Sequence, residues 1–175
     1  MRQPVAHPNG RVTPLTVDVT DAARIQEAVQ RVESVDILIN NAGLPLYDDL
    51  SDPAALEQQL AVSLFGTYGV TRALLPLLTR SRGAIVNVGS VTAFAGLPII
   101  VAYSISKMAV FSLSQSLRAL LGGTGRDGAC GPGRPVDTEM SRALDIPKAS
   151  PESVARAIFD GVENGELVDA QPVLP

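Results

Sequence analysis

The chain has 175 residues and a formal net charge of −4 at pH 7, and 46% of its residues are hydrophobic against 18% charged. This composition is too apolar for a disordered chain, and the length predicts one domain with a sizeable core. With 14 basic and 18 acidic residues, the chain lacks the basic surface of a nucleic-acid-binding protein. The only cysteine, Cys130, excludes an intrachain disulfide and a cysteine metal cluster. The only histidine, His7, leaves little room for histidine-based metal or triad chemistry, so we predict no metal site.

The sequence shows no membrane or export signal. No apolar run approaches the ~20 residues of a membrane span. The first residues, MRQPVAHPNGR, lack the apolar core of a signal peptide. We therefore expect a cytoplasmic protein whose partners include neither a membrane nor nucleic acid.

The first predicted elements are a strand, a helix and a second strand. Residues 11–19 alternate loosely and are rich in valine and threonine, which favours a strand despite Pro14. Thr20 or Asp21 can cap a helix whose apolar residues then recur at helical spacing. Residues 35–40 form a short apolar run, which indicates a buried parallel strand.

A long helix and a third strand come next. Asp52 followed by proline marks a helix start. Apolar residues continue over 53–78, and we expect this helix to bend or end near Pro76. Residues 84–89 form another short apolar run and predict a buried strand.

The last third of the chain contains two predicted helices separated by a glycine-rich segment. Residues 101–121 contain neither glycine nor proline and predict one uninterrupted helix. Residues 122–135 include six glycines and two prolines, so we expect a loop and no strand. The last helix is predicted to begin at Pro151 and to end near Gly165.

Strands and helices thus alternate along the chain. This order is typical of an α/β protein with a doubly wound parallel sheet between helices and right-handed crossovers. We expect residues 1–175 to form a single domain, with residues 1–10 as a disordered start. Ligands of such sheets bind beyond the carboxyl ends of the strands, which directs attention to the residues after each predicted strand.

A tyrosine and a lysine share one face of the predicted helix 101–121. Tyr103 and Lys107 are four residues apart, and Ser90 directly follows the predicted strand 84–89. A phenol has a pKa near ~10, and a nearby ammonium group lowers it, so this pair can exchange a proton with a hydroxyl/carbonyl couple. Ser90 can then hold the substrate oxygen. The alternative is that a tyrosine and a lysine one turn apart form an ordinary helix face.

Several motifs extend this pattern. They are Asp18-Val19-Thr20, the run from Asp36 to Gly43, the run from Gly83 to Ser90, and Tyr103-Ser104-Ile105-Ser106-Lys107. Ser90 and Tyr103 are 13 residues apart, and Pro135-Val136-Asp137-Thr138 follows downstream. Together these motifs resemble the short-chain dehydrogenase/reductase family over residues 12–121 and 135–165. The resemblance implies a Rossmann-like fold.

The resemblance also implies catalytic roles. Tyr103 matches the family's acid/base, Lys107 the residue that lowers the tyrosine pKa and holds the nicotinamide ribose, and Ser90 the residue that orients the substrate oxygen. Ser63 stands where the family has a catalytic asparagine, which shapes a helix kink and holds a water in the proton relay. Since serine has fewer hydrogen-bonding groups than asparagine, we expect a slower enzyme.

Further positions match cofactor contacts of the family, in addition to Tyr103 and Lys107. Asp18 matches the adenine contact, and Thr138 the contact to the nicotinamide carboxamide. Asn41, Ala42 and Gly43 match the turn beside the adenosine. The implied cofactor is NAD or NADP. Asp18 can instead cap the following helix, and Asn41 and Gly43 can instead be turn residues alone.

Two segments depart from the family pattern. Residues 1–34 contain no glycine-rich strand–turn–helix that could approach a pyrophosphate, so we expect an N-terminally truncated sheet without the family's first two strands. Its strand 35–40 would have a bare edge, against which residues 11–19 could pair. Residues 122–134 replace an apolar strand of the family, and we interpret them as a local reading-frame disturbance in the source sequence.

The implied reaction is hydride transfer between NAD(P)(H) and a small-molecule carbonyl compound or secondary alcohol. The alternative is a catalytically inactive, truncated remnant that associates with a full-length relative. Helices 53–78 and 101–121 are the candidate surface for a homo-oligomer.

Overall fold

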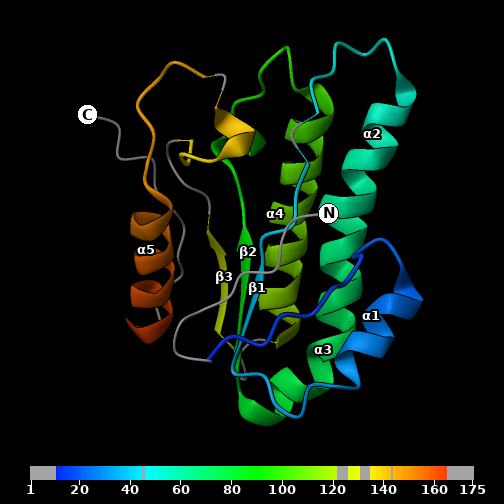
Figure 1. Ribbon diagram of the computed structural model, residues 1–175, viewed down its shortest axis with the longest axis vertical. Coiled ribbons are helices and arrows are strands. Elements are labelled where there is room, and N and C mark those ends of the chain that lie inside the picture. The colour runs from blue at the N-terminus through cyan, green and yellow to red at the C-terminus, as the bar shows by residue number, and fades with distance from the viewer. Residues whose placement is uncertain (1–10, 45, 122–125, 131–134, 143, 165–175) are drawn as a thin grey trace.

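The computed structural model of the chain describes residues 11–44, 46–121, 126–130, 135–142 and 144–164 (Figure 1). The expected disordered start, residues 1–10, lies outside the described residues. The elements in chain order are α1 (Ala22–Val29), β1 (Ile37–Asn40), α2 (Pro53–Leu60), the π-helical segment η1 (Ala61–Gly66), α3 (Thr67–Ser81), β2 (Ala84–Val88), the 3₁₀ turn η2 (Val91–Ala93), α4 (Val101–Leu121), β3 (Arg126–Cys130), the 3₁₀ turn η3 (Glu139–Ser141) and α5 (Pro151–Asn164).

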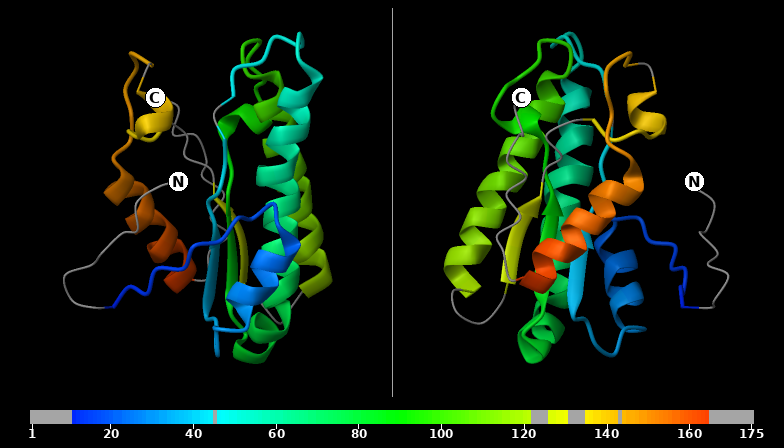
Figure 2. Two further views of the ribbon diagram at one scale, coloured as in Figure 1. Left: turned by 45° about the vertical axis from the view of Figure 1, so that its right-hand side comes forward. Right: turned by 90° about the vertical axis from the view of Figure 1, so that its left-hand side faces the viewer.

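The three strands form one parallel sheet in the order β1-β2-β3. Leu38 pairs with Ile85, and Val86 pairs with Gly128. The two views of Figure 2 show α5 on one side of this sheet and α1–α4 on the other. The predicted α/β architecture, a parallel sheet between helical layers, is confirmed.

Alternation along the strands divides the core into two clusters. Leu38 and Ile85 point to the α3 side, where they pack with Leu74 and Leu78. The next residue along β2, Val86, points to the other side and packs against Ile158 of α5. Because successive side chains of a strand face opposite sides, continuous apolar runs can serve both clusters.

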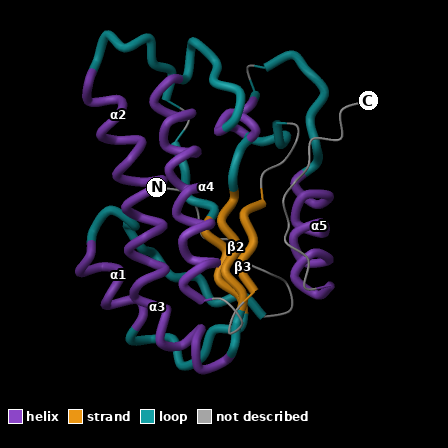
Figure 3. The backbone as a smooth tube through the Cα atoms, turned by 180° about the vertical axis from the view of Figure 1, so that it is seen from behind, coloured by secondary structure: helices purple, strands orange, loops and turns teal. Residues whose placement is uncertain are grey.

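Helices α3 and α4 cover neighbouring parts of one face of the sheet. α3 packs against β1 and β2, and α4 packs against β2 and β3. Figure 3 shows the strands between α4 on one side and α5 on the other. The loop that precedes α4 also packs on it, since the rings of Phe94 and Phe111 meet edge to face with centroids 4.8 Å apart. α4 is therefore held between the sheet and the segment that follows β2.

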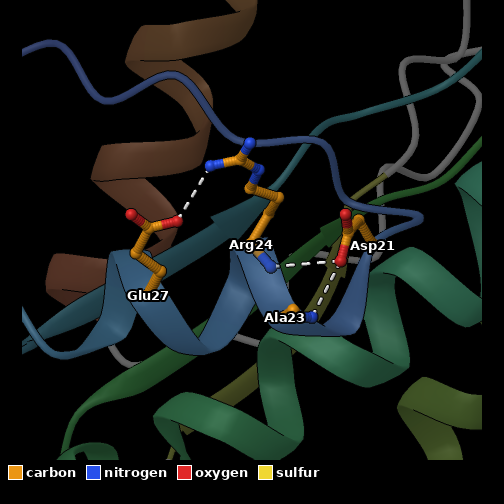
Figure 4. A network of polar contacts seen from close by, with 4 residues as sticks. All are labelled: Asp21, Ala23, Arg24 and Glu27. Atoms are coloured by element: carbon orange, nitrogen blue, oxygen red, sulfur yellow. Dashed lines mark hydrogen bonds and ion pairs between the residues drawn. The ribbon is translucent and has the colours of Figure 1, made fainter.

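The start of α1 is set by an acidic cap (Figure 4). Asp21 Oδ1 accepts hydrogen bonds from the backbone N–H groups of Ala23 at 2.8 Å and Arg24 at 3.2 Å. Of the two cap candidates in the sequence, Asp21 is thus the cap. The Arg24–Glu27 ion pair, 3.0 Å long, lies on the exposed side of the helix and adds little to stability.

The predicted strand over residues 11–19 is wrong. Residues 11–18 adopt no regular structure and cross the β1 side of the sheet on their way to α1 (Figures 1 and 2). Pro14 has no N–H to donate to a ladder, and Val19 is packed against Gly66 on the helical side of the sheet. The expected pairing with β1 is therefore absent from the described residues, and Ile39 of β1 remains 37% exposed.

The predicted loop over residues 122–135 is also wrong in part. Residues 126–130 form β3, which pairs in parallel with β2 over five residues. A parallel ladder joins backbone N–H and C=O groups, so the β2 edge can bind a segment of poor strand propensity. Residues 122–125 and 131–134 lie outside the described residues.

The long helix predicted over 53–78 is one helical run over Pro53–Ser81 that passes through η1. Pro76 does not end it. The end comes at Arg82, whose φ of 55° is left-handed, and at Gly83, whose N–H donates to Leu78 O at 2.9 Å. By length and composition alone this run could cross a membrane, a test that core helices of soluble proteins also pass. Its packed face carries the buried polar residues Gln59, Ser63, Thr67 and Thr71.

Candidate active site

The segment after β2 places the candidate serine. The loops that follow β1 and β2 both lie toward the upper end of the molecule in Figure 1. Ser90 comes two residues after the end of β2 and begins η2. Its Oγ accepts hydrogen bonds from Thr92 Oγ1 at 2.9 Å and from the Thr92 N–H at 3.3 Å. Thr92 is buried, so these two bonds hold the Ser90 hydroxyl oxygen in place.

The first turns of α4 place the tyrosine and the lysine. Lys107 Nζ donates a 2.8 Å hydrogen bond to Val88 O at the end of β2 and lies 5.6 Å from the centre of the Tyr103 ring. The Ser90 side chain also interacts with Tyr103 and acts to lower its pKa. The structure therefore brings together Ser90, Tyr103 and Lys107, as the sequence predicts.

The electrostatics of this cluster differ from the expectation that Lys107 lowers the tyrosine pKa. Burial raises the pKa of Tyr103 above 10, and the Ser90 side chain only partly opposes this shift. Burial also lowers the pKa of Lys107 to about 8. The physical reason is that both side chains are largely withdrawn from water, which disfavours the charged phenolate and the charged ammonium group alike. Tyr103 is consequently a neutral phenol, ready to donate a proton, at pH 7.

Ser63 lies in η1, which packs against α4. It is 1% exposed, and its Oγ has no hydrogen-bond partner among the described residues. The residue one turn earlier, Gln59, is fully buried and donates through Nε2 to Leu44 O at 3.0 Å. The π-helical segment thus keeps the irregular helix expected at this position, with a hydroxyl where the family has an amide.

The turn after β1 lies next to Lys107 at one residue, Gly43. A Cβ added to Gly43 would lie 3.9 Å from Lys107 Nζ, so the backbone here borders the lysine amine. Asn41 and Ala42 are exposed beside it. Of this turn, Gly43 is therefore the residue that borders the Lys107 amine.

Asp18 and Thr138 have only local side-chain hydrogen bonds. Asp18 Oδ1 accepts from the Thr20 N–H at 2.9 Å and the Thr20 hydroxyl at 2.7 Å, and these bonds hold its pKa below the ordinary value. Its carboxylate does not cap α1, which Asp21 does. Thr138 caps η3, where its N–H donates to Ser141 Oγ at 3.3 Å. Within the described residues, neither side chain forms a hydrogen bond with Tyr103 or Lys107.

A buried polar network beneath the site was not predicted. Asn40 Nδ2 donates to Asn87 Oδ1 at 2.9 Å and to Thr71 Oγ1 at 3.1 Å, and Asn87 Nδ2 donates to Ser114 Oγ at 2.8 Å. These four side chains join β1, β2, α3 and α4. A signal was present in the sequence, because both asparagines end or interrupt apolar strands in which an unpartnered amide would be costly.

A comparison with protein families matches residues 2–148 to the model for short chain dehydrogenases. Among curated proteins, the chain is 36% identical over 149 residues to 2-(S)-hydroxypropyl-CoM dehydrogenase 3 of Xanthobacter autotrophicus, covering 81% of this chain and 58% of that protein. It is also 36% identical to the inactive 2-(S)-hydroxypropyl-CoM dehydrogenase 2 of the same organism, covering 81% of this chain and 65% of that protein. The chain thus spans about three fifths of these relatives.

Solved structures show the same similarity. A short chain dehydrogenase from Burkholderia cenocepacia in complex with NADP has a TM-score of 0.78 and 36% identity, covering 90% of this chain and 68% of that one. The closed form of a serine dehydrogenase complexed with NADP+ has a TM-score of 0.73 and 26% identity, covering 82% of this chain and 66% of that one.

Proposed function

Because the chain belongs to the short-chain dehydrogenase family, we propose that it carries out NAD(P)(H)-dependent hydride transfer to or from a carbonyl compound or secondary alcohol, with Tyr103 as the acid/base. The observation that carries this proposal is the cluster at the end of β2, where Lys107 bonds Val88 O and Tyr103 meets Ser90. A tyrosine and a lysine that formed only an ordinary helix face would have no reason to lie beside a serine at the end of a strand. A small carbonyl compound or alcohol is the matching class of substrate.

The residues present suit the nicotinamide end of such a cofactor. Lys107 Nζ has three N–H groups and gives one to Val88 O, so it can donate others to ribose hydroxyls. Within the turn at Asn41, Ala42 and Gly43, Gly43 borders the same amine. When bound, the dinucleotide supplies the hydride chemistry, and the protein supplies position and a proton. Asp18 and Thr138 stay candidate contacts to the cofactor.

The proton chemistry follows from the state of Tyr103. In the reductive direction, the carbonyl carbon gains a hydride and its oxygen gains the Tyr103 proton, while Ser90 holds that oxygen. The resulting phenolate recovers a proton from solvent. In the oxidative direction, the phenolate accepts the hydroxyl proton. Burial keeps the Tyr103 pKa above its ordinary value, so the side chain is the protonated phenol at pH 7, which is the form that donates a proton in the reductive direction.

The test is the rate of NADPH or NADH oxidation with a panel of small ketones and diketones. Tyr103→Phe removes the proton donor and should lower kcat by about 10²-fold or more. Tyr68→Phe, which alters an exposed tyrosine of α3, is the matched control and should keep the native rate. Equal rates in the native protein and the Tyr103→Phe variant would overturn the assignment.

A second candidate is a non-catalytic chain that associates with a longer relative. It is favoured by Ser63, whose hydroxyl replaces an amide, and by the Ile39 side of β1, which no described strand covers. The same assay separates the two candidates when it is repeated with a Ser63→Asn variant. Turnover only in that variant would place the defect at Ser63. Association through α2, α3 and α4 belongs to either candidate and is tested by sedimentation.

A further inference from the structure

A buried carboxylate connects the loop after β1 to the beginning of α4. Asp48 is 8% exposed, and its Oδ2 accepts a 3.0 Å hydrogen bond from the backbone N–H of Ala102. Its Oδ1 accepts a 2.7 Å hydrogen bond from the N–H of Leu50. Both carboxylate oxygens are therefore used, one within the loop and one on a helix 54 residues further along the chain.

The backbone of Asp48 makes the same connection. Its N–H donates to Ile99 O at 3.0 Å, and the residue forms an isolated parallel bridge with Ile100. Leu50 has a φ of 70°, a left-handed conformation that is uncommon for leucine, and the Oδ1 bond holds its N–H. The loop is thus built to present one carboxylate oxygen to α4.

The contact lies one residue before the candidate acid/base. The first N–H groups of a helix have no partner within the helix, and a carboxylate there both accepts a hydrogen bond and is favoured by the helix dipole. Ala102 is 1% exposed, so an unmet N–H at this position would be buried. Tyr103 is the next residue, and Lys107 follows one turn later.

Neighbouring acidic residues act only locally. Asp49 Oδ1 accepts from the Ser51 N–H at 3.0 Å, and Asp52 Oδ1 accepts from the Ala54 N–H at 2.9 Å. Neither reaches another element through these bonds. The sequence does not distinguish Asp48 from these residues, because its remote partner is a backbone group.

We propose that Asp48 is a positioning residue that fixes the first turn of α4 and thereby the place of Tyr103 at the end of β2. This inference rests on the proposed function for the role of Tyr103, but the placement itself can be measured without turnover. The groups that face the Tyr103 side chain are Lys107 and Ser90, and the Asp48 carboxylate acts on it only through the backbone.

The experiment is an ultraviolet titration of the Tyr103 phenol in a Tyr47→Phe/Tyr68→Phe background, where it is the only tyrosine of the chain. Asp48→Ala should loosen the first turn, admit water and move the titration midpoint down by about half a pH unit or more, toward the ordinary value near 10. Asp48→Asn keeps one side-chain oxygen that can accept from the Ala102 N–H. Its titration midpoint should therefore lie between those of the native protein and Asp48→Ala. Asp49→Ala is the matched control and should leave the midpoint unchanged.

Circular dichroism of each variant at the starting pH shows whether it is folded. Folded Asp48→Ala with the native midpoint would overturn the proposal. If Asp48→Ala does not fold, Asp48→Asn decides, since an unchanged midpoint there would equally overturn it. Turnover with NADPH is measured in parallel, and Asp48→Ala should lower kcat more than it raises the KM for NADPH. A shifted midpoint together with Tyr103→Phe at the native rate would preserve the positioning role and reject the proposed function.

Discussion

Two buried serines of α4 and η1 differ in their partners, although each is at most 3% exposed. Ser114 accepts a hydrogen bond from Asn87 Nδ2 and donates one to Val110 O, both at 2.8 Å. Ser63 Oγ has no partner among the described residues. Ser114→Ala should therefore cost about 1–3 kcal/mol in unfolding free energy, because it strands the buried Asn87 amide. Ser63→Ala should be close to neutral.

Urea unfolding of the two variants against the native protein measures this difference. The substitution is the same in both, so helix propensity cancels in the comparison. A cost for Ser63→Ala as large as that for Ser114→Ala would mean that the Ser63 hydroxyl has a strong partner in solution.

The buried ammonium group of Lys107 predicts a pH dependence of stability. Its pKa is about 8 in the folded chain, against 10.5 when unfolded, so between these values the unfolded state binds more protons. Stability contributed at this position therefore rises from about pH 8 upward, by a total on the order of 3 kcal/mol. Below pH 8 the loss of unfolding free energy that comes from burying the charged Lys107 ammonium group does not change with pH. Since the raised Tyr103 pKa acts in the opposite direction above pH 10, the clean window is pH 8 to 10.

Lys107→Met removes this titration. Its unfolding free energy should exceed that of the native protein most at pH 7, and the gap should narrow toward pH 10. Urea unfolding at one-unit intervals checks the expectation, and parallel curves for the two proteins would contradict it.

For individual residues, the sequence predicts which side chains lie together better than it predicts how their surroundings shift their pKa values. Tyr103 and Lys107 share a helix face by spacing alone, and Ser90 follows from the strand end. The acceptor of Lys107 is a backbone carbonyl 19 residues earlier, which no side-chain pattern reveals. The raised pKa of Tyr103 is equally hidden from the sequence, because it comes from burial by residues distant in the chain.

Among the elements, η1 depends on a close approach at Gly66. A Cβ there would lie 2.9 Å from Val19 Cγ2 and 3.1 Å from its Cβ. In an open helix, alanine in place of glycine stabilises by up to about 1 kcal/mol. At Gly66 the contact with Val19 outweighs this gain, so we expect Gly66→Ala to cost about 1–3 kcal/mol in unfolding free energy.

Two further variants locate the cause of that cost. Val19→Ala removes the nearest atom and should recover part of the loss in the double variant. Gly96→Ala, where the added Cβ meets nothing within 4 Å, is the control and should not destabilise. Additive costs of Gly66→Ala and Val19→Ala in chemical denaturation would show that the two residues are not in contact.

This contact explains why the strand prediction failed for residues 11–19, while the helix over 101–121 and the strands over 35–40 and 84–89 were predicted well. Elements whose own apolar pattern is strong, such as 101–121 and 84–88, follow from the sequence. Segments with a weak pattern take the conformation that their surroundings offer: residues 11–18 lead to a helical surface, and 126–130 pair with the open side of β2. Those surroundings are formed by residues distant in the chain.

For the whole molecule, the question is whether the sheet, which has three strands in the described part of the chain, binds a dinucleotide. A ligand that binds only the folded state stabilises it by about 2.7 kcal/mol at a hundred times its dissociation constant. For a chain of this length that corresponds to a rise in Tm of roughly 5–10 °C. If the cluster around Lys107 binds the nicotinamide ribose, excess NADPH or NADH should raise the Tm of the native protein.

The same melt on Lys107→Met separates binding at this cluster from binding elsewhere. Loss of the ammonium donors should reduce the cofactor-induced shift by well over half, although the variant is itself more stable at pH 7. An equal shift in both proteins would place the dinucleotide away from Lys107. Unchanged Tm values with either cofactor would mean that neither binds, although Ser90, Tyr103 and Lys107 lie together. That result would favour the non-catalytic candidate.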